Sequence, residues 1–356
     1  MTACPAIDPA APLQFVINAA SGSSASDSKR ALIEAALQAA GRRGDLHFCQ
    51  PAELAQVAQQ ATATALASRT AVVAVGGDGT LNTVAQYAHA AGCAMGVVPQ
   101  GTFNYFARTH GIPADPADAV QQLLGWAAQP VQVAAINQRV FLVNASMGLY
   151  PDLLEDREAY KARFGRSRWV AFWAACVTLL RAQRQLRLHI EQGTTARDLR
   201  TLVLFVGNNR LQLQHLGVHP QEGATGSDAE NPPAKPAHAH LLATSAGHIT
   251  AVMLRPIGTL AMLRLMLRGA LGSLGEAPSV EHFEFEHLVV RPTLTPGRRG
   301  VKVAYDGEVA RMRAPLDFRV LERPLFLLMP PPQEPASNPA SMPAAKADAR
   351  AGVSVA

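Results

Sequence analysis

A glycine-rich turn around an aspartate is the segment whose residue types most clearly suggest chemistry. The sequence Gly76-Gly77-Asp78-Gly79-Thr80 directly follows the β-branched run Ala71–Val75 and precedes a helical pattern that starts at Leu81. Glycines permit positive φ and close backbone approach, so successive N–H groups can point into one concavity. We expect Thr80 at the N-cap, where the helix dipole favours an anion. The turn predicts a phosphate-binding site; a tight strand-to-helix turn without a ligand is the alternative.

Neither of two common nucleotide-binding motifs describes this turn. No Gly-Lys-Ser/Thr sequence ends it, so it is not a P-loop, and Asn82 stands where the dinucleotide fingerprint has its third glycine. A second polar glycine turn, Gly101-Thr102-Phe103-Asn104, follows the next apolar run, and Asn18–Gly22 follows the first one. Loops at the carboxyl ends of neighbouring parallel strands converge on one crevice. Together the three loops make a nucleotide site more credible than one loop alone.

The elements that position these loops alternate regularly over residues 13–135. Short apolar runs typical of buried strands are separated by stretches with helical spacing of apolar residues. The expected strands are Leu13–Ile17, Leu46–Cys49, Ala71–Val75 and Ala94–Val98, and the expected helices are Ser28–Ala40, Ala52–Ala67, Leu81 to about Gly92 and Pro116 to about Trp126, the last with Asp115 as N-cap. This alternation predicts a doubly wound α/β domain with a parallel sheet covered on both faces.

The pattern changes after about residue 130, where apolar runs follow one another with loops between them. These runs are Val131–Ile136, Arg139–Ala145, Leu188–Glu191, Thr201–Val206, Ile249–Leu254, His282–Val290 and Val301–Tyr305. They predict a mostly antiparallel, β-sandwich-like second domain over residues 136–317. Residues 219–240 and 331–356 are rich in proline and small residues and are expected to be disordered, and residues 1–12 are expected to be flexible.

Length and composition limit the classes of protein that this chain can be. Its 356 residues, 48% of them hydrophobic, are enough for two packed domains. No stretch reaches the roughly 18 apolar residues of a spanning helix, and the N-terminus has no secretory pattern, so we expect a cytoplasmic protein. The four cysteines form no CxxC pair, which argues against a cysteine-based zinc or redox motif.

The positive charge is concentrated in one segment. Eight basic side chains and one acid between Arg157 and Arg187 give that segment a charge of +7, which leaves −2 of the net +5 for the remainder. Such a patch favours an anionic partner. Aromatic residues lie among the arginines, as in an interfacial helix, and the residues expected to contact an anionic membrane are Arg166, Arg168, Trp169 and Trp173. The alternative is that these apolar side chains are core. Nucleic acid is not an expected partner, because the patch is short.

The paired glycine motifs resemble those of the diacylglycerol kinase catalytic-domain family, which includes soluble bacterial diacylglycerol kinases, related lipid kinases and sphingosine kinases. The resemblance rests first on Gly76–Thr80 with Asn82, and on Gly101–Asn104 with Phe106-Ala107-Arg108. It continues through Asn144–Gly148, Gly207-Asn208-Asn209 and Asp306-Gly307-Glu308, and so covers about residues 13–330.

The resemblance implies transfer of the γ-phosphoryl group of ATP, with Mg²⁺, to a lipid hydroxyl. The nucleotide would lie between the glycine loops and the second domain, and residues 318–330, near Leu325–Met329, would return to the first domain. The residues implied to bind ATP are Asn18, Ser21, Gly76, Gly77, Asp78, Gly79, Thr80, Gly101, Thr102 and Asn104.

Two aspartates are candidates for the base that accepts the hydroxyl proton. By resemblance to sphingosine kinases the base is Asp78, and by resemblance to bacterial diacylglycerol kinases it is Asp306, with Glu308 as a nearby metal-binding or orienting carboxylate. Asp78 and Glu308 are the candidate metal ligands. Asp306-Gly307 is also a plausible hairpin turn without a catalytic role, and the two roles are compatible.

Two positions depart from the family pattern. Tyr105 replaces a common aspartate, which weakens any metal or substrate role there, and Ser245-Ala246 replaces acids that bind a structural Mg²⁺ in some bacterial members, so that second metal is not expected. The sequence therefore predicts a lipid kinase that acts on diacylglycerol or a similar lipid alcohol at a membrane surface. The alternatives are a kinase of a soluble substrate, of the NAD kinase type, and a non-catalytic lipid or nucleotide sensor. A homodimer is left open.

Overall fold

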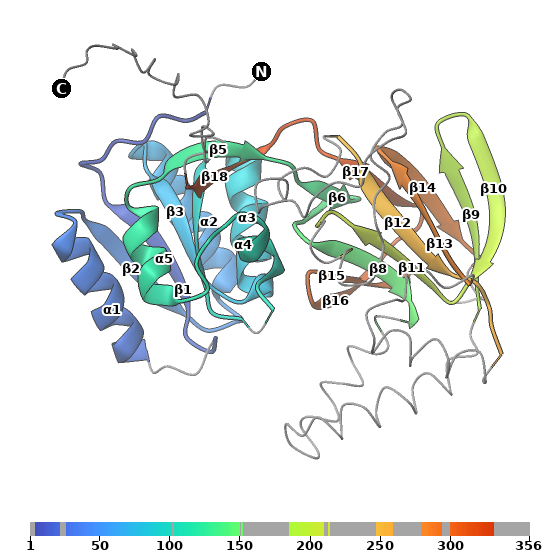
Figure 1. The fold of residues 1–356 in the computed structure, drawn as a ribbon, viewed down its shortest axis with the longest axis horizontal. Helices are drawn as coiled ribbons and strands as arrows, with labels where there is room; N and C mark the ends of the chain where they lie inside the picture. The colour runs from blue at the N-terminus through green and yellow to red at the C-terminus, as the bar shows by residue number, and fades with distance from the viewer. Residues whose placement is uncertain are drawn as a thin grey trace, which may run out of the picture.

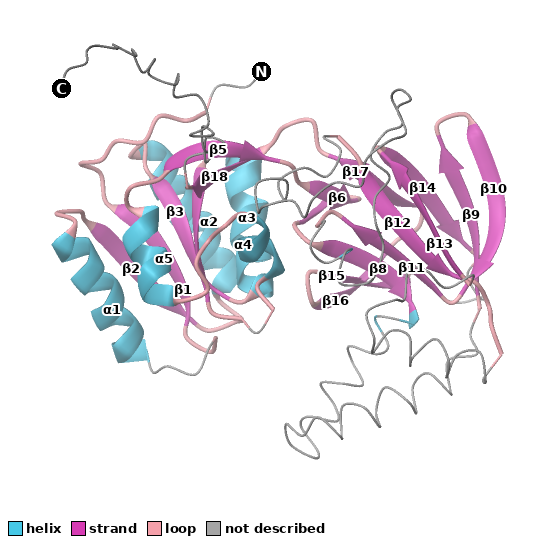
Figure 2. Ribbon diagram, in the orientation of Figure 1, coloured by secondary structure: helices cyan, strands magenta, loops and turns pink. Residues whose placement is uncertain are grey.

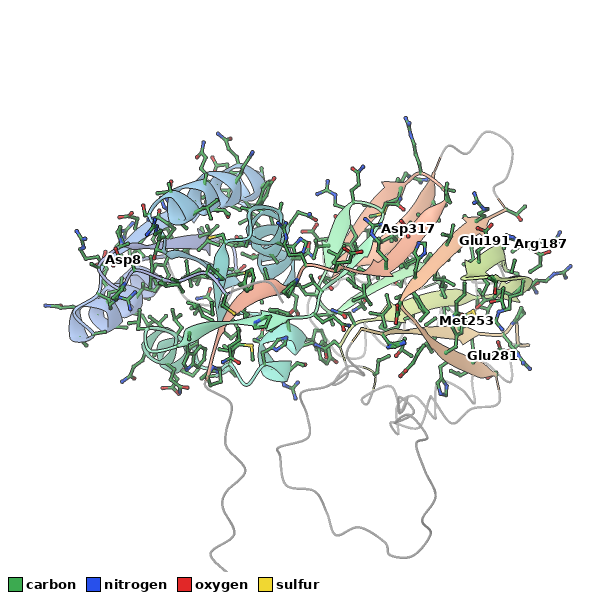
Figure 3. The ribbon with its side chains drawn as sticks, turned by 90° about the horizontal axis from the view of Figure 1, so that it is seen from above. Asp8, Arg187, Glu191, Met253, Glu281 and Asp317 are labelled. Carbon is green, nitrogen blue, oxygen red and sulfur yellow. The ribbon has the colours of Figure 1, made fainter. Side chains whose placement is uncertain are left out.

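The computed structural model describes residues 4–21, 26–101, 103–149, 151, 185–209, 213, 247–258, 279–293 and 300–330. In these residues an N-terminal α/β domain is followed by a β-rich domain with antiparallel sheets, as the sequence predicts (Figures 1 and 2). The two domains lie side by side: in Figure 3, Asp8 lies on the first, and Arg187, Glu191, Met253 and Glu281 lie toward the far end of the second. Residues 219–240 and 331–356 lie outside the described residues.

The described strands of the first domain form one six-stranded sheet in the order β2-β1-β3-β4-β18-β5. Its strands are β1 (Leu13–Asn18), β2 (Gly44–Cys49), β3 (Ala71–Gly76), β4 (Ala94–Pro99), β5 (Ala127–Val131) and β18 (Leu325–Met329). Neighbours are parallel except β5, which runs antiparallel to β18. β3, β4 and β18 are buried along their whole length, which explains why they read as continuous apolar runs.

Helices cover both faces of this sheet. They are α1 (Ser26–Ala39), α2 (Leu54–Ala67), α3 (Asp78–Ala91), α4 (Tyr105–Thr109) and α5 (Pro116–Leu123). α1 packs against α5, and α2 packs against α3, which gives one pair on each side (Figure 1). The predicted N-cap of α5 is confirmed, because the Asp115 carboxylate accepts hydrogen bonds from the backbone N–H groups of Ala117 and Asp118.

The described strands of the second domain form two further six-stranded antiparallel sheets. One has the order β10-β9-β14-β17-β6-β7 and the other β13-β12-β11-β8-β15-β16. The strands are β6 (Ala134–Ile136), β7 (Arg139–Phe141), β8 (Asn144–Gly148), β9 (Leu186–Gln192), β10 (Thr195–Thr201), β11 (Val203–Gly207), β12 (Ile249–Leu254), β13 (Val280–Phe285), β14 (His287–Pro292), β15 (Val301–Tyr305), β16 (Glu308–Met312) and β17 (Leu316–Val320). Apolar side chains from both sheets form one shared core.

Several expected strands are divided in the structure. The run Val131–Ile136 is split between β5 and β6, and the run Arg139–Ala145 between β7 and β8, with the two parts of each run in different sheets. The run His282–Val290, expected as one strand, is divided at Glu286 into β13 and β14, which belong to different sheets. The alternation of apolar residues changes phase at Glu286 and His287, and the strand divides there. Strand β10 was not predicted because its side chains are mostly polar and exposed; it forms by pairing with β9 across a turn at Gly193.

The chain crosses between the domains at slightly different places than predicted. Residues 134–136 form β6 and pair with β17, so the second domain begins before residue 136. Residues 318–320 are part of β17, so the return to the first domain follows Val320 rather than starting at 318. In both cases the pairing partner of a short strand determines the domain to which that strand belongs.

Candidate active site

The predicted glycine loops lie where the strand order of the first sheet reverses. From β1 the chain moves outward to β2, and β3 then lies on the other side of β1. Ligands of open α/β sheets bind outside the carboxyl ends of the strands at such a switch point. Here those ends carry Asn18, the last residue of β1, and Gly77, which follows β3.

Helix α3 begins three residues earlier than predicted. Gly77 is its N-cap, with extended backbone angles, and Asp78, Gly79 and Thr80 form its first turn, so Thr80 is not the cap. None of the glycines of this turn has a positive φ. The turn therefore presents the first free N–H groups of a 14-residue helix, which is the geometry that binds phosphate, without left-handed backbone.

The glycines at 77 and 101 allow the two predicted loops to touch. A Cβ on Gly101 would lie 3.0 Å from Cα of Gly77 and 2.7 Å from Oδ1 of Asn104. Asn104 has a positive φ of 47°, and its amide closes the second loop by exchanging two 2.9 Å hydrogen bonds with the backbone of Gly101. Asn104 thus holds the loop and does not line the cleft described below; Thr102 lies outside the described residues.

The loop after β1 is hydrogen-bonded to the glycine turn at residues 76–80, called the phosphate turn below, and to a buried lysine. Nδ2 of Asn18 donates to Oγ1 of Thr80 at 3.0 Å. The Nζ of Lys29, in the first turn of α1, donates to the carbonyl oxygens of Ser21 and Asn18. Lys29 is only 3% exposed, and burial lowers its pKa. Lys29 was not among the predicted site residues. Its position on the buried side of α1 is a signal that could have found it, because lysine is rarely buried.

A cleft between the two domains is lined by the loop after β1 and by the glycine turn after β3. Its volume is about 470 Å³. The first domain contributes Asn18, Ser21, Pro51, Leu54, Ala55, Gly77, Asp78, Gly79, Thr80, Asn82, Thr83, Gln86 and Tyr87, and the second contributes Arg139, Tyr305 and Glu308. The structure therefore brings together most of the residues predicted to bind ATP and two of the three predicted catalytic residues.

Asp78 is the cleft carboxylate with free binding capacity. Its Oδ1 is buried and has no hydrogen-bond partner. Burial raises the pKa of Asp78 to about 6; the nearby Asp306 carboxylate raises it as well, and a hydrogen bond from the backbone N–H of Asn104 opposes both effects. A partly buried acid with a pKa near neutrality and an oxygen without a hydrogen-bond partner has the properties of a general base.

Asp306 lies behind the cleft and is fully hydrogen-bonded. Its Oδ2 accepts from Nδ2 of Asn82 at 2.7 Å and from the backbone N–H of Leu142 at 2.6 Å. Its Oδ1 accepts from the N–H groups of Val143 and Asn144 at 2.9 and 3.0 Å. The pKa of Asp306 is raised, because burial outweighs the opposing effect of these donors. All four partners are donors, so the pocket accommodates the ionised form and leaves no oxygen directed at the cleft.

The turn that Asp306 anchors places Glu308 in the cleft. Asp306 and Gly307 both have positive φ, as expected for the hairpin between β15 and β16. Oε1 of Glu308 lies 3.3 Å from where a Cβ on Gly79 would be, so the carboxylate of the second domain reaches the phosphate turn of the first. Partial burial raises the pKa of Glu308, while Arg139 and a hydrogen bond with Tyr305 lower it.

Helix α3 also carries the contacts that join the domains. Nδ2 of Asn82 donates to the carbonyl of Val140 at 2.8 Å as well as to Asp306, and Oε1 of Gln86 accepts from the N–H of Val140 at 2.9 Å. Asn82 and Gln86 lie four and eight residues after Asp78, on the same face of the helix. That spacing is a signal from which the sequence could have assigned them to the site.

The carboxylates of the cleft fit a magnesium ion that is shared with a nucleotide. Within the described residues no cluster of three or more His, Cys, Asp or Glu side chains could hold a metal alone. Mg²⁺ in phosphotransferases commonly uses one or two carboxylates together with substrate phosphates and water. Asp78 and Glu308, on opposite walls of the cleft and both near the first turn of α3, provide that set.

The predicted membrane-contact residues Arg166, Arg168, Trp169 and Trp173, and the Ser245-Ala246 pair, lie outside the described residues. Among the helices in the described part of the chain, none is both long and apolar enough to cross a bilayer.

Comparison with known proteins identifies the first domain. The model of the diacylglycerol kinase catalytic domain family matches residues 12–136. A Pseudomonas aeruginosa protein named "Probable lipid kinase YegS-like" is 40% identical over 95 residues, which are 26% of this chain and 30% of that protein. A Pectobacterium atrosepticum protein of the same name is 30% identical over 145 residues, which are 39% of this chain and 48% of that protein. The matches thus span less than half of these relatives.

The fold similarity extends over both domains. A crystal structure described as a diacylglycerol kinase from Bacillus anthracis has a TM-score of 0.60 and 15% identity, and covers 90% of this chain and 97% of its own. Another Bacillus anthracis structure, assigned provisionally to the same activity, has a TM-score of 0.64 at 18% identity with the same coverage. Residues 12–136 of the chain thus match the diacylglycerol kinase catalytic-domain family, and both domains share their fold with the two Bacillus anthracis structures.

Proposed function

We propose that the protein transfers the γ-phosphoryl group of ATP to the hydroxyl of diacylglycerol or a similar lipid alcohol. The observation that carries this proposal is the cleft at the first turn of α3, where Asp78 from one domain and Glu308 from the other flank the helix N-terminus. Phosphoryl transfer requires a phosphate cradle, carboxylates for Mg²⁺ and a proton acceptor. The described residues can supply all three.

Nucleotide phosphates would bind the free N–H groups at residues 77–80, with Asn18 and Ser21 beside them. Mg²⁺ held by Asp78 and Glu308 would neutralise charge on the phosphates and on the leaving ADP oxygen. Gly79 has no side chain to block the approach of Glu308 to this point. We assign the metal-bridging role mainly to Glu308, because Asp78 has an oxygen that can accept a proton.

Asp78 is the proposed base, and Asp306 is a positioning residue. The Asp78 carboxylate would take the proton of the lipid hydroxyl as the hydroxyl oxygen bonds to the γ-phosphorus and the bond from that phosphorus to the β,γ-bridging oxygen breaks, releasing ADP. Its pKa of about 6 leaves it ionised at neutral pH and still basic enough to accept a proton. Asp306 would act through the turn that carries Glu308, since both of its oxygens are occupied by donors.

The remaining partners are proposed from the sequence. A lipid alcohol requires access to a membrane, and the arginine- and tryptophan-rich segment that includes Arg166, Arg168, Trp169 and Trp173 is suited to peripheral attachment to an anionic surface from the cytoplasm. A homodimer also remains a prediction. Co-sedimentation with anionic and with neutral vesicles measures the attachment, and equal recovery in the two pellets would contradict it.

The function is tested by incubating the protein with labelled ATP, Mg²⁺ and a panel of lipid alcohols in mixed vesicles, with NAD as a soluble acceptor. We expect labelled lipid, loss of at least about a hundredfold in rate for Asp78→Asn, as for removal of a general base, and no loss for Asp118→Asn, an exposed aspartate on α5. Labelling of NAD alone would indicate a soluble-substrate kinase, and no labelling with no ATP binding would refute the proposal.

A further inference from the structure

Arg139 is a cation in the cleft that the proposed mechanism has not used. It begins strand β7 of the second domain and is exposed. The ionisable residues that line the cleft are Asp78, Tyr87, Tyr305, Glu308 and Arg139, so Arg139 is the one cation among the lining residues that the structure describes. A single arginine opposite a phosphate-binding helix N-terminus is placed to meet an anion.

The backbone beside Arg139 is fixed to the phosphate-binding helix. The next residue, Val140, uses its N–H to bind Gln86 and its carbonyl to bind Asn82, both on α3, at 2.9 and 2.8 Å. Asn82 lies one helical turn after Asp78. The start of β7 is therefore held in register with the first turn of α3, although the two segments belong to different domains.

The guanidinium of Arg139 influences groups that lie beside the phosphate turn. Its charge lowers the pKa of Glu308 and of Tyr305, which places it within electrostatic range of both. The Glu308 carboxylate in turn lies against Gly79. No ion pair forms between Arg139 and either cleft carboxylate within the described residues, so its donors are available for a ligand.

We propose that Arg139 binds the terminal phosphoryl oxygens of ATP and stabilises their charge during transfer. The inference rests on the proposed function. Arginine suits this role because its planar donor fork matches phosphoryl oxygens and stays charged at any relevant pH. Charge on the equatorial oxygens is what catalysis of phosphoryl transfer must stabilise. The second domain would thus contribute a cation to chemistry whose cradle is in the first.

Direct binding separates this role from others. Two calorimetric titrations are made without lipid, one with Mg·ADP and one with Mg²⁺ and a nonhydrolysable ATP analogue. Both are compared for wild type, Arg139→Gln and Arg313→Gln. Arg313 is a matched control, because it is an exposed arginine that does not line the cleft. It lies near the turn between β6 and β7, where the side chain of Asn137 donates to the Arg313 carbonyl. We expect Arg139→Gln to lose about tenfold in affinity for the analogue, as for one charged hydrogen-bonded contact, and little for ADP. Arg313→Gln should lose neither.

Three results would overturn the inference. Equal affinity of wild type and Arg139→Gln for the analogue would remove Arg139 from the phosphoryl site, and an equal loss for ADP and the analogue would place it elsewhere along the nucleotide. An unchanged analogue affinity with a raised KM for lipid would show that the anion is a lipid headgroup. If wild type binds neither nucleotide, the proposed function fails first.

Kinetics provide a second readout on the folded enzyme. Arg139→Gln should lower kcat with little change in the KM for lipid, and Arg139→Lys should recover part of kcat, because a lysine keeps the charge and loses the fork. Thermal unfolding of both variants should match wild type, since the side chain is exposed. Full kcat in Arg139→Gln would contradict the proposal.

Discussion

The surroundings of Asp78 lower the stability of the folded protein and favour a role for its carboxylate as a proton acceptor. An acid whose pKa is raised by burial and by a second carboxylate is less stable as an anion in the folded protein than in the unfolded chain. Its open Oδ1 adds a buried acceptor without a donor. Groups that are kept in this condition are concentrated at functional sites.

Replacing Asp78 by Asn should therefore stabilise the fold at neutral pH. The folded-state pKa lies above the unfolded one, so the destabilisation is absent well below pH 4, grows as the pH rises to about 6 and is complete above it. We expect Asp78→Asn to raise the free energy of unfolding by about 1 to 2 kcal/mol at about pH 7.5, less than the full shift because the side chain is partly exposed. Urea unfolding at that pH and near pH 4 measures the difference, and an equal gain at both would contradict the assignment.

The same pKa predicts how activity depends on pH. If Asp78 accepts the hydroxyl proton, kcat/KM should rise as the pH increases through about 6 and then level off, because the anion is the active form. Initial rates between about pH 5 and 8 on vesicles of constant composition measure this. A profile that is flat through pH 6 in wild type would exclude Asp78 as the base.

Lys29 is a second residue whose role depends on burial. Its ammonium holds two carbonyl groups of the loop that carries Asn18 and Ser21. Replacement by Met keeps the volume but leaves those carbonyls without a donor, so we expect about tenfold weaker ATP binding and a loss of about 1 to 3 kcal/mol in stability. Titration calorimetry and urea unfolding measure the two effects, and Lys29→Arg, which keeps the charge, should lose less. Unchanged ATP affinity in Lys29→Met would remove the loop from the nucleotide site.

At the scale of elements, the site depends on two loops that touch through their glycines. The turn after β3 and the turn after β4 approach at Gly77 and Gly101, and Asn104 closes the second turn and donates its N–H to Asp78. The packing of the two turns therefore helps to fix the carboxylate that we assign as base.

Gly101→Ala tests this packing. The added Cβ would lie 3.0 Å from the Gly77 backbone and 2.7 Å from Oδ1 of Asn104, so a turn must move. We expect a loss of about 1 to 3 kcal/mol in stability and a larger relative loss of ATP affinity. Gly258→Ala is the control, because a Cβ added there would meet nothing within 4 Å and the φ of Gly258 is not positive. Equal stability and equal ATP affinity of the two variants would refute the packing role.

At the scale of the whole molecule, the two domains are interdependent. The chain leaves the first domain after β5, builds the second, and returns to insert β18 between β4 and β5. Arg323, just before β18, donates to the carbonyls of His89 and Ala90 at the end of α3, and His89 bonds the carbonyl of Arg323. One end of α3 thus meets the returning chain and the other forms the phosphate turn.

A fragment that ends at residue 136 should therefore not fold as a stable domain, although it contains the matched family region. It lacks β18, which is buried along its length, and β5 would have no neighbour. We expect no cooperative thermal transition for residues 4–136, and recovery of one when residues 321–330 are joined to its end by a flexible linker. Cooperative melting of the shorter fragment by circular dichroism would contradict this.

Local sequence patterns were sufficient to predict most of the α/β domain, except β5 and α4, and the position of its loops. Strands β1, β3 and β4 are buried on both faces and read as continuous apolar runs, and α5 has an explicit N-cap in Asp115. The glycine turns and Asn18 were placed at one edge by the rule for parallel strands alone. Strand β10 could not be predicted, because it forms by pairing with β9. The division at Glu286 has a local signal in the phase change between Phe285 and Leu288, but only the pairing partners show that its two halves belong to different sheets.

The sequence by itself predicted a glycine turn around an acid at residues 76–80, between a strand and a helix, because glycine content and position after a strand are local properties. Only the tertiary structure distinguishes the surroundings of the two acids. Asp78 and Asp306 look equivalent in the sequence, yet Asp78 lines the cleft and has a buried oxygen without a hydrogen-bond partner, whereas Asp306 is enclosed by four donors from distant parts of the chain. The surroundings of a carboxylate are set by contacts between distant segments, and those contacts exist only once the two domains have packed together.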